Sequence, residues 1–191
     1  MNLRLIIRFI IVATVTWVLL TMFMGCTLDV ENVDKPFEAD ICENSLGNVA
    51  CNFTMIDQNG NQVDLYSFHG KIIILDLSAM WCGPCQYAAL DTENTVKKYG
   101  AENIVYITVL IENTSGQPPS LQDLTKWSET FGIVDSPVLA GSRQWLNDSG
   151  YALSGWPTFY FISEDMIITE YQRGYGKINV DRAIEDLLAA Q

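Results

Sequence analysis

The sequence predicts an α/β fold, in which helices flank a mixed central β-sheet. Two continuous apolar runs, at 71–78 and 103–112, are typical of strands that are buried on both faces of a sheet. Segments with helical start and stop signals follow these runs. Because 49% of the 191 residues are apolar, the chain can bury a sizeable core, and its length fits one domain with a short extension.

The N-terminus differs in composition from this domain. Arg4 and Arg8 precede an apolar run at 9–24, and Gly25-Cys26 follows this run. A positive start, an apolar middle and a small residue before the cleavage point are typical of a secretory signal. As a helix, the run would rise about 24 Å, short of the roughly 30 Å hydrocarbon core of a bilayer. We therefore expect residues 1–25 to be a signal peptide.

The Gly25-Cys26 ending resembles a bacterial lipobox, in which the cysteine becomes the lipidated first residue of the mature chain. The resemblance implies a lipid on Cys26 and attachment to the extracytoplasmic (periplasmic) face of a bacterial membrane. An uncleaved anchor and simple secretion are the alternatives, and all three place the domain outside the cytoplasm. Residues 26–45 are acidic and poorly periodic, so we expect an acidic tether there and the domain at 46–191.

The domain is expected to begin with a β-hairpin. Segments 51–57 and 62–67 have the composition of short strands, and a Gln-Asn-Gly-Asn turn signal at 58–61 separates them. The buried strand at 71–78 comes next. A helix at 82–99 follows it, and a glycine ends this helix.

The second half continues the alternation of strands and helices. Its expected elements are a strand at 103–112, a helix at 120–131 capped by Ser120 and stopped by Gly132, a short strand candidate at 136–141, a hairpin at 156–174 that follows an insertion, and an amphipathic helix at 179–191. Without the short candidate, the order is β-β-β-α-β-α-β-β-α.

The charge and the cysteines limit the function. A net charge of −12 excludes nucleic acid as a partner, because no basic patch is present to neutralise phosphates. Apart from Cys26, four cysteines remain, and an even number in an oxidising compartment suggests pairs. Their spacing predicts the pairs Cys82–Cys85 and Cys42–Cys51.

The Cys82–Cys85 pair has the context of a redox-active dithiol. It follows a buried strand directly and opens a helix, where unpaired N–H groups and the helix dipole favour an anionic, reactive thiolate. Cys85 lies one turn further on, near enough to resolve a mixed disulfide formed at Cys82. We therefore expect Cys82 to be ionised and exposed. A structural disulfide or half of a zinc site are the alternatives, and we expect neither a metal nor another cofactor.

Several residues together resemble the thioredoxin superfamily, and the lipid anchor, N-terminal hairpin and long segment before the last hairpin resemble its membrane-tethered TlpA/ResA-like (redoxin) branch. The residues that carry the resemblance are Asp76, Trp81, Cys82, Gly83, Pro84, Cys85 and Gly155 to Thr158. The resemblance covers about residues 46–190. It implies a thioredoxin fold.

The resemblance also implies roles for these residues. Cys82 is the attacking and Cys85 the resolving cysteine, while Asp76 helps to deprotonate the resolving thiol. The residues expected to contact the substrate are Trp81, Gly83, Pro84, Trp156 and Pro157. The Trp156–Pro157 bond is expected to be cis, and the backbone of Trp156 would pair with an extended target. Three features depart from the pattern: no lysine lies near Asp76, the TlpA/ResA-like branch often has a neutral residue at the Asp76 position, and Trp156 is bulkier than the usual residue before the proline.

These observations predict an extracytoplasmic, membrane-anchored thiol–disulfide oxidoreductase that reduces protein disulfides and is itself reduced by a membrane electron donor. A thiol peroxidase on the same fold and a non-enzymatic copper or haem carrier are the alternatives. For Cys42 and Cys51, a structural disulfide, two free thiols and a second redox pair remain open.

Overall fold

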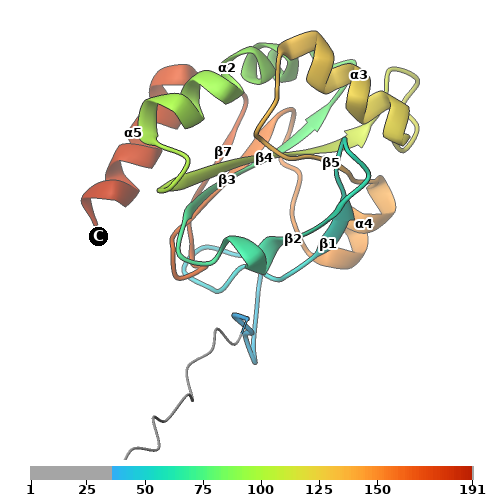
Figure 1. Ribbon diagram of the computed structural model, residues 1–191. Coiled ribbons are helices and arrows are strands. Elements are labelled where there is room, and N and C mark those ends of the chain that lie inside the picture. Colours follow the sequence, from blue (N-terminus) through green and yellow to red (C-terminus); the bar gives the residue numbers. More distant parts are fainter. Residues whose placement is uncertain (1–35, 191) are drawn as a thin grey trace, which may run out of the picture. The chain divides into compact units, whose positions relative to one another are not determined.

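The central element is a five-stranded mixed sheet with the strand order β5-β4-β3-β6-β7 (Figure 1). The structure is a computed structural model that describes residues 36–190; the predicted signal peptide, Cys26 and the first part of the tether lie outside the described residues. In the middle of the sheet, β3 (Ile72–Ala79) pairs in parallel with β4 (Ile104–Glu112) and antiparallel with β6 (Thr158–Ile162). The predicted fold class, a thioredoxin fold, is confirmed.

Two edge strands and a separate hairpin complete the β-structure. β5 (Val138–Ala140) lies parallel to β4, and β7 (Ile168–Arg173) lies antiparallel to β6. β1 (Thr54–Ile56) and β2 (Gln62–Asp64) form the expected hairpin as a two-stranded sheet of their own, which a short 3₁₀ helix, η1 (Leu65–Phe68), follows.

Both faces of the central sheet are covered, which explains why most residues of β3 and β4 are apolar. All eight residues of β3 are buried. On one face lie α2 (Gly83–Tyr99), α3 (Leu121–Phe131) and α5 (Lys177–Ala189), and on the other lie the β1–β2 hairpin, η1 and α4 (Arg143–Ser149) (Figure 1). Because successive strand side chains point to opposite faces, β3 contributes alternate residues to two separate apolar cores.

The helix ends follow the capping signals of the sequence. Ser120 accepts a hydrogen bond from the amide of Asp123 at the start of α3, and Asp123 accepts one from the amide of Ser120, so the two form a capping box. Gly132 ends α3 in the left-handed conformation, with φ at 67°. α5 begins at Lys177, two residues before the predicted start.

Helix α4 was not predicted. It has only seven residues, capped by the side chain of Ser142, and it lies within the insertion between β5 and β6. A helix of two turns is too short to show a clear apolar period, and contacts with the sheet stabilise it instead. Leu146 of α4 belongs to the core on the hairpin side of the sheet.

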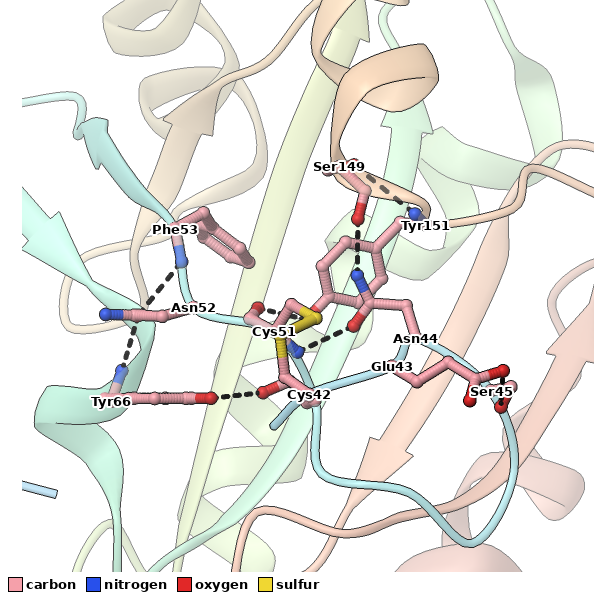
Figure 2. The surroundings of a disulfide bond; sticks show 11 residues. Cys42, Glu43, Asn44, Ser45, Cys51, Asn52, Phe53, Tyr66, Ser149 and Tyr151 are labelled. Carbon is pink, nitrogen blue, oxygen red and sulfur yellow. Dashed lines mark hydrogen bonds between the residues drawn. A yellow bond between two sulfur atoms is a disulfide. The ribbon is translucent and has the colours of Figure 1, made fainter. Parts of the chain in front are cut away.

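The N-terminal segment packs on the domain earlier than expected. The tether was predicted to reach residue 45, yet the ring of Phe37 stacks on His69 with ring centroids 4.4 Å apart. A disulfide joins Cys42 to Cys51, and the side chain of Asn44 accepts a hydrogen bond from the amide of Cys51 and donates one to the carbonyl of Ser149 (Figure 2). Residues 36–45 are therefore part of the packed domain.

Among the residues that the structure describes, no helix is both long and apolar enough to cross a membrane.

We predict that the Cys42–Cys51 disulfide stabilises the fold by closing a short loop. Replacing both cysteines with serine is expected to lower the free energy of unfolding by about 2–3 kcal/mol, because the unfolded chain regains the entropy that the crosslink removes. Urea unfolding of the oxidised protein and of the double variant measures the difference. Equal stabilities would show that the disulfide has no structural role.

Candidate active site

The two cysteines of the Cys-x-x-Cys motif lie where β3 passes into α2. β3 ends at Ala79, and Cys82 is the N-cap of α2 with extended backbone angles. Its sulfur forms a disulfide with the sulfur of Cys85. The same Cys82 sulfur accepts a hydrogen bond of 3.1 Å from the backbone amide of Cys85. Pro84 lies in the first turn, where a missing N–H removes no intrahelical bond. After reduction, the same amide is placed to stabilise a thiolate on Cys82.

Cys82 is buried in this oxidised state. The prediction that its sulfur is exposed is therefore wrong for the disulfide form. The residue is 3% exposed and Cys85 is 0% exposed. Both cysteines belong to one apolar cluster. That cluster also contains Met80, Ala89, Leu110 and Trp127, with Trp156 packed against it. Trp81, Gly83 and Pro84 remain exposed around the disulfide.

The loop before β6 reaches the dithiol, as the resemblance implied. The Trp156–Pro157 peptide bond is cis. Trp156 packs against the cluster that holds both cysteines, and its ring meets Trp81 edge to face with centroids 5.5 Å apart. Within the described part of the chain, the backbone N–H and C=O of Trp156 make no hydrogen bond. Sheet register explains the proximity: Thr158 pairs with Leu77, so Pro157 lies level with the end of β3.

Asp76 is a buried carboxyl group in the middle of the sheet. It is 1% exposed, and burial raises its pKa to about 7, although hydrogen bonds from Ser78 and Tyr106 oppose this shift. The hydroxyl of Ser78 donates at 2.6 Å and that of Tyr106 at 3.4 Å. Within residues 36–190 no cation pairs with Asp76, so two hydroxyl groups take the place of the lysine that thioredoxins carry there.

Two charged residues beside the dithiol were missed by the sequence analysis. Glu112, the last residue of β4, pairs with Ala79 and accepts a hydrogen bond of 2.8 Å from the indole nitrogen of Trp81. Its other carboxylate oxygen accepts a bond of 2.5 Å from Nε of Arg143. The Arg143 guanidinium lies 5.2 Å from the centre of the Trp156 ring.

The environment of Glu112 favours its ionised form. Burial opposes ionisation, but hydrogen bonds from Arg143 and Trp81 and the positive charge of Arg143 outweigh it, so the pKa of Glu112 is lowered. A glutamate at the end of an apolar strand is a signal that the sequence contains. The contribution of Arg143 could not be found in this way, because it depends on the unpredicted helix α4.

The described residues contain no group of three or more His, Cys, Asp and Glu side chains arranged to hold a metal ion.

The raised pKa of Asp76 predicts a specific pH dependence of stability. The unfolded carboxyl group ionises near pH 3.9, whereas the folded one keeps its proton up to about pH 7. The stabilisation that this proton provides is therefore complete below about pH 4 and is lost as the pH rises to about 7. Asp76→Asn cannot ionise and lacks this loss.

The measurement is the free energy of unfolding of oxidised wild type and oxidised Asp76→Asn from about pH 4 to about pH 8. The wild type should lose, relative to the variant, on the order of a few kcal/mol across this interval. A difference that stays constant with pH would show that Asp76 ionises normally in the folded protein.

Comparison with curated proteins links the chain to thiol–disulfide enzymes. It is 26% identical over 121 residues to the thiol-disulfide oxidoreductase ResA of Bacillus subtilis, which covers 63% of each chain. It is 48% identical over 46 residues to a thioredoxin of Coprinus comatus, which covers 24% of this chain and 43% of that protein. The chain thus spans less than two thirds of the length of these two relatives.

Solved structures share the fold. The thioredoxin domain of a thiol-disulfide oxidoreductase from Bacteroides vulgatus matches with a TM-score of 0.63 and 19% identity over 75% of this chain and 98% of that one. The exposed lipoprotein thioredoxin of Streptococcus pneumoniae matches with a TM-score of 0.58 and 22% identity over 71% of this chain and 99% of that one.

A sequence profile described as the AhpC/TSA family matches residues 46–171, which include Asp76, the dithiol and the cis-proline loop. The matched region is about two thirds of the chain. With the dithiol, the cis-proline and the mixed sheet in their places, the chain belongs to the AhpC/TSA (redoxin) family of the thioredoxin superfamily, among TlpA/ResA-like proteins.

Proposed function

We propose that the protein is a thiol–disulfide oxidoreductase that reduces disulfides in other proteins. The observation that carries the proposal is the Cys82–Cys85 disulfide at the start of α2, with the amide of Cys85 directed at the sulfur of Cys82. A disulfide between residues three apart, at a helix N-terminus and beside a cis-proline loop, is a site for reversible exchange. The thiol–disulfide oxidoreductases among its relatives support the assignment.

The reaction transfers two electrons from the dithiol to the target. The thiolate of reduced Cys82 attacks one sulfur of the target disulfide, and a mixed disulfide forms while the other target sulfur leaves as a thiolate. Cys85 then loses its proton and attacks Cys82, which releases the second target sulfur. The target leaves as a dithiol and the enzyme as the Cys82–Cys85 disulfide. A separate two-electron donor must reduce it again.

Asp76 is the group proposed to accept the proton of Cys85. It lies on the same face of β3 as Ile72 and Ile74, which belong to the core that α2 covers. With a pKa raised to about 7 by burial, the carboxyl group can exchange a proton near neutral pH.

The target is proposed to bind as an extended segment along the cis-proline loop. The unbonded backbone N–H and C=O of Trp156 can pair with such a segment in the manner of an added strand. The exposed residues Trp81, Gly83 and Pro84 provide the surrounding surface.

Thiol exchange is favoured over peroxide reduction by the surroundings of Cys82. The peroxidases of this superfamily usually place an arginine beside the reactive cysteine. Here Arg143 instead binds Glu112 and the ring of Trp156, and the sulfur of Cys82 is already paired with Cys85 three residues away.

We predict that the purified domain, residues 36–191, catalyses the reduction of insulin by dithiothreitol. Cys82→Ser should abolish turnover because it removes the attacking sulfur. Cys85→Ser should accumulate a mixed disulfide with insulin, detectable by mass spectrometry. Consumption of hydrogen peroxide and binding of Cu(I) are measured in parallel. Peroxide turnover without insulin reduction, or stoichiometric Cu(I) binding by a redox-inert protein, would contradict the proposal.

The protein is further proposed to act outside the cytoplasm, held to a membrane through a lipid on Cys26 and reduced by a membrane electron donor. The signal-like composition of residues 1–25 and the similarity to an exposed lipoprotein thioredoxin support this location.

Expression of the full chain in a bacterium supplied with labelled palmitate tests the anchor. The wild type should incorporate label and sediment with membranes. Cys26→Ser should remain unlabelled. It should be released from the membrane if its signal is cleaved and should stay in the membrane if its signal is retained. A wild type without label would contradict lipidation.

A further inference from the structure

Four side chains around the disulfide form a closed ring of contacts. We name Trp81, Glu112, Arg143 and Trp156 the Glu112 bridge. Trp81 comes from the dithiol loop, Glu112 from the end of β4, Arg143 from the start of α4, and Trp156 from the cis-proline loop. The bridge therefore connects two loops, a strand and a helix that meet only in the folded protein.

Glu112 is the member of this ring that accepts hydrogen bonds from two others. One carboxylate oxygen accepts the hydrogen bond of the Trp81 indole at 2.8 Å, and the other accepts that of Arg143 at 2.5 Å. Arg143 lies over the Trp156 ring, and the two indoles meet edge to face. Such hydrogen bonds to a charged group in a partly buried site are stronger than ordinary ones.

The position of Arg143 indicates that the contact is not a by-product of helix stability. It is the first residue of α4, where the helix dipole disfavours a positive charge. Its side chain remains 57% exposed, whereas that of Glu112 is 12% exposed. The buried carboxylate thus holds an exposed cation in place, and that cation holds an indole.

Both indoles lie beside the dithiol. Trp156 packs on the cluster in which Cys82 lies, and Trp81 precedes Cys82 in the chain and is 46% exposed. Glu112 holds Trp81 directly and Trp156 through Arg143, and Cys82 between these loops is 3% exposed. The cis-proline loop offers an approaching target the unbonded backbone N–H and C=O of Trp156.

We propose that Glu112 is a positioning residue that makes the dithiol selective for disulfides in extended protein segments over small free disulfides. The proposal rests on the proposed function. By holding both indoles, the Glu112 bridge keeps a narrow entrance to Cys82 that a strand-like segment can use through backbone pairing. A small disulfide gains nothing from such pairing and is hindered by the indoles.

Glu112→Gln tests this role while conserving size. The amide NH₂ group cannot accept a hydrogen bond, so the variant loses the contact to Trp81 or the contact to Arg143. Reduction of insulin should slow by about tenfold, the effect of losing one charge-assisted hydrogen bond in the productive complex. Reaction of the reduced enzyme with hydroxyethyl disulfide should stay equal or become several-fold faster.

Glu170→Gln is the matched control. Glu170 binds Arg182 at 2.7 Å in an equivalent pair between β7 and α5, and it takes no part in the site. This control should leave both rates unchanged. Arg143→Gln, which releases Trp156 but keeps the Trp81–Glu112 bond, should shift the ratio of the two rates in the same direction as Glu112→Gln.

The outcomes distinguish a failure of the proposed function from a failure of the selectivity role. If the wild type does not reduce insulin, the proposed function is wrong and this inference falls with it. If the wild type reduces insulin and Glu112→Gln changes both rates by the same factor, or neither rate, the selectivity role is wrong and the bridge is merely structural. Unfolding curves of the variants verify that each is folded. If Glu112→Gln does not fold, the ratio of the two rates in Arg143→Gln tests the selectivity role instead.

Discussion

The burial of β3 on both faces is the constraint on which the rest of this structure depends. A strand enclosed between two apolar cores cannot shift in register without exposing its side chains, so its end is fixed in space. Cys82 caps the helix that starts beyond that end, and its position follows directly. The same burial removes water from Asp76 and moves its pKa to about 7. The geometry of the dithiol and the proton affinity of its neighbour thus have one cause.

The neighbours of β3 bring the remaining groups to this end of the sheet. β4 runs parallel to β3, so both strands finish at the same edge, where Glu112 pairs with Ala79. β6 runs antiparallel to β3, so it begins at this edge, and the loop that precedes it carries Pro157 to the dithiol. A mixed sheet is therefore needed for the site: with β6 reversed, its preceding loop would lie at the opposite edge.

The two carboxyl groups near the dithiol differ in proton affinity because their environments differ. Asp76 has only hydroxyl partners, from Ser78 and Tyr106, and the cost of burial dominates its proton affinity. Glu112 has a guanidinium and an indole N–H as partners, and they lower its pKa in spite of burial. The first group can exchange a proton near neutral pH, whereas the second remains a fixed negative charge. This contrast agrees with a proton-transfer role for one and a positioning role for the other.

The sequence by itself determined the features that depend on short-range patterns. The buried strands, the capped helix α3 and the dithiol at a strand–helix junction follow from periodicity and from residues a few positions apart. The resemblance to a family added the cis bond before Pro157. Only the tertiary structure decided that Cys82 is covered in the disulfide form, that residues 36–45 pack on the domain and that Arg143 reaches Glu112. These features join residues far apart in the chain, and sheet register and helix packing set such contacts, which no local pattern of residues encodes.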